Sequence, residues 1–172
     1  MDGTLIANAG DLERELDWFV NVLEARLAAY FDRENGDKRR FYLPPPQLVE
    51  GSPYASFILH HKVDPTTRLI ILLALIPHVR PQLLDVLWTR NEATQRSFSE
   101  FGGVHSSSGG FLPTGETAAF LLAGDDLGAR FETMRLFDAE SFLARHAVVH
   151  LAAVGPGEPQ FGGLLTISRE FL

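Results

Sequence analysis

The stretch SFLARHAVVHLAAVGPGEPQFGGLLTISREFL, residues 141–172, decides the predicted fold. Its two apolar segments, 142–153 and 163–172, contain β-branched and aromatic residues. The sequence GPGEPQFGG between them is dense in turn-forming glycine and proline. Two apolar segments joined in this way are typical of a pair of strands. The stretch therefore predicts a C-terminal β-hairpin.

A long amphipathic helix is predicted near the start of the chain. Asp11 is a suitable N-cap residue for it. The polar segment DRENGDKRR, with Gly36 as the helix breaker, ends the pattern. Three consecutive prolines in FYLPPPQLVEGS then remove backbone donors, so the connector that follows is predicted to be irregular. The apolar residues of the helix recur at spacings of three and four: Leu12, Leu16, Phe19, Val20, Leu23, Leu27 and Tyr30 or Phe31.

Several shorter helices are predicted after the connector. Ser52 and Asp64 are capping residues, and each is followed by a proline in the first helical turn. The second of these starts leads into LIILLALIP, an apolar run of about half the length that crosses a bilayer. Pro77 closes this run, which predicts a buried core helix. After Pro81, QLLDVLWTR predicts a short helix and NEATQRSFSEF a weak one.

Two more helices are predicted just before the hairpin. Thr114 or Gly115 opens a helix over ETAAFLLAG, and Gly124 ends it. Asp125 then caps a helix over DLGARFETMRLF. Helices followed by a terminal β-hairpin are the pattern of a winged-helix unit.

The predicted fold class is therefore α+β, mainly α. A helical N-terminal part is followed by a winged-helix-like unit with a C-terminal β-hairpin. We expect residues 1–50 to hold the amphipathic helix and the proline-rich connector, and residues 51–172 to form a helical, winged-helix-like domain packed with it.

Composition limits the possible classes of protein. A chain of 172 residues that is 45% hydrophobic can bury a proper core. It has no cysteine, which excludes disulfides, thiolate metal sites and cysteine nucleophiles. The N-terminal sequence MDGTLIANAGDLERE lacks the basic start and the apolar stretch of a signal peptide. We expect a cytoplasmic protein that does not associate with a membrane.

The sequence GGVHSSSGGFLPTG is the segment most like a phosphate-binding loop. A Walker-type loop needs a lysine directly after its last glycine to reach the terminal phosphates. Here Phe111 follows Gly110, and no lysine occurs after Lys62. No strand-like segment precedes the loop, as a dinucleotide site requires. A surface loop is therefore favoured over a cofactor site.

The histidines and serines define weaker alternatives. His146 and His150 lie four apart, but ARHAVVHL is predicted to be a strand, and no third ligand lies near them, so no metal site is predicted. A small hydrolase that uses the Gly-Ser loop stays open, because catalytic triads are recognised by geometry. No catalytic residue is singled out.

The predicted helix before the hairpin argues against DNA binding. In a winged helix of the DNA-binding kind, this helix would approach the phosphate backbone, which attracts lysine and arginine. The chain carries a net charge of -7. The segment DDLGARFETMRLFD has four acidic side chains against two basic ones: Asp125, Asp126, Glu132 and Asp138 against Arg130 and Arg135. Protein contact is therefore favoured, with a DNA-binding winged-helix regulator as the alternative.

Several phrases of the sequence resemble a known family. They are LDWFVNVLEARLAAYF, PPPQL, SPYASFI, LIILLALIPHVRPQLLDVLWTRN, EFGGVHSSSGGFLPTGETAAFLLAGDD and LLTISREFL. Together they are similar to the N-terminal domain that precedes the ATPase module in a group of bacterial AAA+ proteins. This group resembles the ATPases encoded with extracellular contractile injection systems. The similarity runs from Asp11 over nearly the whole chain.

The resemblance implies a non-catalytic accessory domain of winged-helix type. ATP and Mg²⁺ would bind in a downstream module, because this chain has no Walker lysine and no Walker B run. The expected partners are that ATPase module and components or cargo of the injection particle. No nucleic acid is expected as a partner.

An apolar patch beside the Gly-Ser loop is the predicted partner-binding surface. It consists of Phe101, Phe111, Leu112 and Pro113. Apolar residues on a loop can serve as recognition anchors. The alternative is that these phenylalanines pin the loop to the core, since large apolar residues are more often buried than presented.

Overall fold

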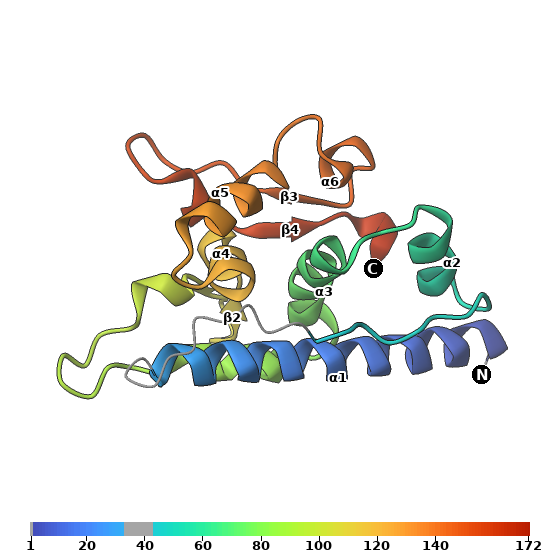
Figure 1. Cartoon of the computed structure of the whole chain (residues 1–172), viewed down its shortest axis with the longest axis horizontal. Coiled ribbons are helices and arrows are strands. Elements are labelled where there is room, and N and C mark those ends of the chain that lie inside the picture. Colours follow the sequence, from blue (N-terminus) through green and yellow to red (C-terminus); the bar gives the residue numbers. More distant parts are fainter. Residues whose placement is uncertain (1, 33–42) are drawn as a thin grey trace. The chain divides into compact units, whose positions relative to one another are not determined.

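The computed structural model describes residues 2–32 and 43–172 (Figure 1). The fold is α+β and mainly α, with two small antiparallel sheets among the described residues. The chain forms two compact units, Met1–Leu72 and Leu73–Leu172. The predicted domain boundary at residue 50 stays a prediction. The predicted helix breaker Gly36 lies outside the described residues.

The first unit begins with helix α1, Gly3–Phe31. Its N-cap is Asp2, whose Oδ1 accepts a hydrogen bond of 3.1 Å from the Thr4 amide. The prediction that Asp11 caps this helix is wrong. Asp11 lies inside the helix and is buried, because its carboxylate bonds a side chain of another element instead of the helix's own amides.

Helix α2, Pro53–His60, and helix α3, Pro65–Val79, follow in the order expected. Both predicted caps are confirmed: Ser52 Oγ accepts from the Ala55 amide at 3.0 Å, and Asp64 Oδ1 accepts from the Thr67 amide at 3.1 Å. Every side chain from Leu69 to Ile76 is buried, as predicted for a core helix.

Pro77 does not end α3, which continues to Val79. A proline inside a helix removes the hydrogen bond that its nitrogen would donate and crowds the carbonyl four residues back, and here the helix continues for only two residues beyond it. Among the described residues, no single helix is long and apolar enough to cross a bilayer; α3 and the following helix pass that test only together, across a bend of 103°.

The second unit contains the short 3₁₀ helix η1, Pro81–Trp88, where a short helix was predicted. The weak helix predicted over NEATQRSFSEF is wrong. Asn91 Oδ1 accepts from the amides of Ala93 and Thr94, which closes a turn, and only Ser99–Phe101 (η2) is helical. Asparagine side chains compete with helical hydrogen bonds in this way.

The Gly-Ser loop is the tip of a small hairpin. Strand β1, Val104–His105, pairs antiparallel with β2, Phe111–Leu112. Helix α4, Gly115–Ala123, follows, and Gly124 ends it with a positive φ of 55°, as predicted. Asp126, and not the predicted Asp125, caps helix α5, Leu127–Arg135: its Oδ1 accepts from the Ala129 amide at 3.0 Å.

The C-terminal hairpin is confirmed, but both of its strands are shorter than the predicted segments 142–153 and 163–172. Ser141 caps a short helix α6, Phe142–Arg145, so the first half of segment 142–153 is not a strand. Strand β3, Val149–Leu151, then pairs antiparallel with β4, Leu165–Ile167, with His150 opposite Thr166. The short helices η3, Gln160–Gly162, and η4, Arg169–Phe171, flank β4.

A third short segment extends the β3–β4 pair. The Leu165 amide donates to the Pro113 carbonyl at 2.9 Å, and the Gly115 amide donates to the Gly163 carbonyl at 3.1 Å. Residues 113–115 therefore lie on the free side of β4, just before α4. Helices α4 and α5 are preceded by this short segment and followed, after the four-residue helix α6, by a hairpin that pairs with it (Figure 1). The arrangement is winged-helix-like, with α5 as the last long helix before the wing.

Candidate functional site

Helix α5 presents three large apolar side chains to solvent. Leu127 is 67% exposed, Phe131 is 61% exposed and Met134 is 38% exposed. They are spaced four and three residues apart, so they lie on one face of the helix. We call these three residues the α5 stripe. Adjacent exposed apolar side chains of this kind can mark a surface that binds a partner.

Residues next to the α5 stripe fix the helix within its unit. Arg130 Nη2 lies 2.6 and 2.9 Å from the two carboxylate oxygens of Glu116 on α4. The same guanidinium lies 5.7 Å from the centre of the Phe161 ring. Thr133 is buried and bonds the Ala129 carbonyl at 2.9 Å. The Arg130 contacts and the burial of Thr133 thus set the rotation of α5 that leaves the stripe exposed.

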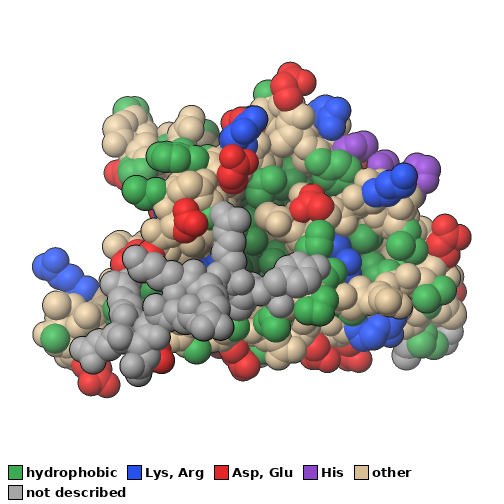
Figure 2. All heavy atoms as spheres, viewed as in Figure 1, with side chains coloured by type: hydrophobic (Ala, Val, Ile, Leu, Met, Phe, Trp, Pro, Cys, Tyr) green, Lys and Arg blue, Asp and Glu red, His purple; other side chains and the backbone are tan. Residues whose placement is uncertain are grey.

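Acidic side chains dominate the charges around the α5 stripe. Asp125, Asp126 and Glu132 are exposed beside it. Arg135 is also exposed but lies 3.9 Å from Glu132. Figure 2 shows hydrophobic side chains next to acidic ones on the surface over α5. A phosphate backbone would be repelled here, whereas a partner protein with an apolar patch and basic flanks would be attracted.

The predicted partner-binding patch is mostly buried. Phe101 is 1% exposed, Phe111 is fully buried and Pro113 is buried, while Leu112 is half-buried. Phe101 packs against Phe120 of α4, with 4.6 Å between ring centres. The placement agrees with the alternative reading, in which the phenylalanines pin the loop to the core.

The glycines of the loop allow this burial. Gly102 and Gly103 have positive φ values of 61° and 82°. A Cβ on Gly103 would overlap the Phe111 ring, and a Cβ on Gly102 would overlap the Thr114 side chain. Glycine is therefore needed where the chain passes close to a ring and to the start of α4.

The N-terminus of α4 is occupied by groups of the protein itself. The Thr114 amide donates to Thr117 Oγ1 at 3.0 Å, and Thr117 Oγ1 donates to the Phe101 carbonyl at 2.8 Å. Thr114 and Thr117 are both buried. A phosphate has no access to this helix start, although a glycine-rich segment precedes it.

The serines of the loop close the hairpin tip. Ser106 Oγ accepts from the Gly110 amide at 2.9 Å and lies 3.0 Å from Ser108 Oγ. The neighbouring His105 ring stacks on Trp88. These contacts hold the loop as a turn, so its serines and His105 have a structural role.

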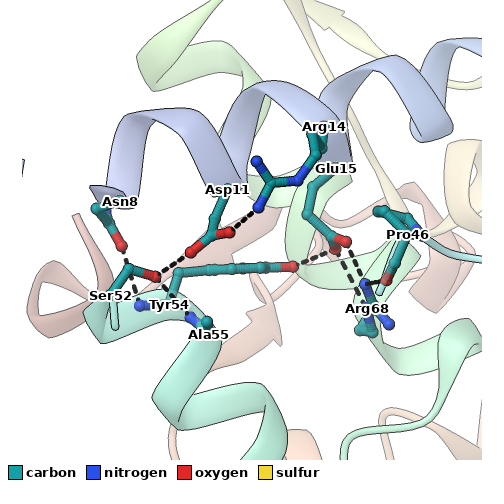
Figure 3. A network of polar contacts seen from close by, with 9 residues as sticks. All are labelled: Asn8, Asp11, Arg14, Glu15, Pro46, Ser52, Tyr54, Ala55 and Arg68. Atoms are coloured by element: carbon teal, nitrogen blue, oxygen red, sulfur yellow. Dashed lines mark hydrogen bonds and ion pairs between the residues drawn. The ribbon is translucent and has the colours of Figure 1, made fainter. Parts of the chain in front are cut away.

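A cluster of polar contacts lies in the first unit (Figure 3). Glu15 of α1 is fully buried and pairs with Arg68 of α3, whose Nε lies 3.1 Å from Glu15 Oε2. Tyr54 of α2 donates to the same oxygen at 2.6 Å. Arg68 also donates to the Pro46 carbonyl at 3.1 Å and lies 5.3 Å from the centre of the Trp18 ring.

A second polar contact joins α1 to the start of α2. Ser52 Oγ donates to Asp11 Oδ2 at 2.5 Å, and the Tyr54 amide donates to Asn8 Oδ1 at 3.0 Å. Arg14 pairs with the other oxygen of Asp11. The buried carboxylates of this cluster are fully bonded, so we assign the cluster a structural role.

Tyr54 has a strongly perturbed ionisation. Its removal from water, and next the negative charge of Glu15, raise its pKa well above the usual 10.0. Both effects disfavour the phenolate. At neutral pH, Tyr54 is therefore a hydrogen-bond donor to Glu15.

His146 and His150, which were predicted to lie on one strand, lie in different elements. His146 follows helix α6 and His150 lies in β3. Within residues 2–32 and 43–172, no three His, Asp or Glu side chains converge on a possible metal position.

The sequence analysis missed the α5 stripe. The spacing of Leu127, Phe131 and Met134 was visible, but the segment was interpreted only through its charges. Comparison with known protein families, curated proteins and solved structures finds no match for this chain.

Proposed function

We propose that this chain is a non-catalytic protein-interaction domain and that the α5 stripe is its contact surface. The observation that carries the proposal is the exposure of Leu127, Phe131 and Met134 on the helix before the wing. In a DNA-binding winged helix this position carries basic residues, whereas here it is apolar with acidic flanks.

The resemblance described above supplies the context of the proposal. The domain would serve a cytoplasmic bacterial AAA+ ATPase as its N-terminal accessory domain. ATP and Mg²⁺ would bind in the ATPase module, outside this chain. The α5 stripe would hold a component or cargo of a contractile injection particle near the ATPase ring.

The energetics favour a small apolar contact. Binding energy in protein interfaces is concentrated in a few buried anchors, each contributing about 2 kcal/mol or more. Phe131, in the middle of the stripe, is the best candidate for such an anchor. The acidic flanks would add to the association rate and the specificity more than to the affinity.

The test is a pull-down of the encoded ATPase module and injection-particle proteins with the tagged domain. The variant Phe131→Ser is expected to lose capture. The matched control is Val86→Ser, which changes an exposed apolar residue of η1 outside the stripe. Equal capture by both variants would contradict the proposal, as would tight, salt-sensitive binding of random duplex DNA.

A further inference from the structure

Strand β3 has one side paired and one side open. In the antiparallel register, the Ala152 amide donates to the Leu164 carbonyl, and the Ser168 amide donates to the Val148 carbonyl. Backbone groups alternate in direction along a strand, so those of Val149 and Leu151 point away from β4. Among the described residues, no group hydrogen-bonds to the backbone of Val149 or Leu151 on that side.

An apolar cavity of about 500 Å³ lies beside this open edge. Residues 149–154 form one wall. The other wall includes Met134, Phe137 and Phe161, and Asp138 also lines the cavity. Phe137 and Phe161 meet edge to face, with 5.8 Å between ring centres. The cavity can therefore take apolar side chains directly next to unpaired backbone groups.

The residues that line the cavity include one carboxylate, Asp138, and no lysine or arginine. Residues 125–160 contain six acidic and three basic side chains. One of the three bases, Arg130, is already paired with Glu116. A ligand with lysine or arginine is favoured by this field, and a second copy of the same surface is disfavoured by like-charge repulsion.

From these features we infer that β3 accepts an extended segment of a partner protein as an added strand. The segment alternates apolar residues, which enter the cavity, with basic residues, which face the acidic surroundings. A helical partner would leave the outward groups of Val149 and Leu151 unbonded, because a helix satisfies its own backbone. The inference does not depend on the resemblance to AAA+ proteins, and it shares with the α5 stripe only Met134, which lines the cavity.

The first test uses an acetylated and amidated Val-Lys-Val-Lys-Val-Lys peptide, with Val-Glu-Val-Glu-Val-Glu as its charge control. Titration of the whole domain, followed by NMR, is expected to slow amide exchange at Val149 and Leu151. The Glu peptide is expected to bind at least tenfold more weakly. In Asp138→Asn, the ratio between the affinities of the Lys peptide and the Glu peptide is expected to be severalfold smaller.

A pair of variants isolates the outward amide. Leu151→Pro and Leu151→Ala both remove the side chain, but only the proline removes the N–H that points away from β4. An edge strand tolerates proline at such a position. Leu151→Pro is expected to bind the Lys peptide at least tenfold more weakly than Leu151→Ala.

Methylated peptides keep the test independent of the stability of any variant. In an added strand, either the valine amides or the lysine amides face β3. Methylation of one set is expected to abolish binding to the unmodified domain, and methylation of the other set is expected to leave it within about threefold. Equal effects of the two methylations, or no binding at millimolar peptide, would overturn the inference. A dimer that Leu151→Pro dissociates would instead assign the edge to a second copy of the chain.

Discussion

The Trp88 indole stacks on the His105 imidazole, with 3.8 Å between ring centres and 12° between the ring planes. Phe111 meets the same indole edge-on at 4.8 Å. Trp88 lies at the end of η1, and the other two rings lie on the β1–β2 hairpin. The three rings therefore fix the hairpin to η1.

Replacing His105 should loosen the hairpin. Aromatic pairs contribute about 0.5 to 1.5 kcal/mol beyond the area that they bury. His105→Ala is expected to lower the free energy of unfolding by about that amount, and His105→Phe by less, since a ring remains to stack. Urea denaturation followed by circular dichroism measures both values. A loss of the same size in the two variants would argue against stacking as the cause.

Breaking the Glu15–Arg68 pair should strongly destabilise the first unit. Glu15→Ala leaves a buried guanidinium without its carboxylate, which costs about 3 to 5 kcal/mol. Asp17→Asn removes an exposed charge two residues away and serves as the control. The double variant Glu15→Leu/Arg68→Met is expected to recover much of the loss, because it removes both charges and leaves neither one buried without its partner. Equilibrium urea unfolding measures all three.

Tyr54 makes stability depend on alkaline pH. Its folded-state pKa is raised above the unfolded value of 10.0, so the fold favours the protonated phenol. This contribution is fully present below pH 10 and is lost as the pH rises through the folded pKa. The free energy of unfolding is expected to fall above about pH 10, and less steeply in Tyr54→Phe. Parallel slopes for the two proteins in urea titrations between about pH 9 and 11 would contradict this account.

Comparing alanine variants of two glycines distinguishes the cost of steric overlap from the cost of an unfavourable backbone conformation. Gly103 and Gly109 have similar φ values of 82° and 87°, but only Gly103 lies against a ring. Gly103→Ala is expected to cost about 1 to 3 kcal/mol more than Gly109→Ala, because only the first forces Phe111 to move. Thermal unfolding of the two variants gives the comparison. Equal losses of stability in the two variants would mean that the backbone conformation, and not the overlap with Phe111, causes the destabilisation.

Local signals in the sequence predicted much of the fold. Ser52 and Asp64 cap helices, and Gly124 ends one, because each acts on amides or carbonyls within a few residues. The prediction for Asp11 failed because its partner, Ser52, lies 41 residues away and the sequence does not show that contact. The early strand assignment at residue 142 failed because Ser141 starts a helix of four residues, too short to show a periodic pattern.

The candidate site was less predictable than the fold. From the sequence alone, Phe101 and Phe111 could equally be exposed or buried. The structure shows that both are buried and that the backbone at Gly102 and Gly103 passes close to the Thr114 side chain and the Phe111 ring. The α5 stripe has an ordinary helical spacing, which a buried helix would share. Exposure is a property of tertiary packing, so the sequence could not distinguish a core face from a docking face.

The boundary between the two compact units falls inside α3, between Leu72 and Leu73. Amide-to-carbonyl bonds of an α-helix reach back four residues, so several of them span this boundary. Truncation at residue 72 would sever a continuous helix and expose side chains that are now buried. Shortened versions of the protein should therefore retain all of Pro65–Val79.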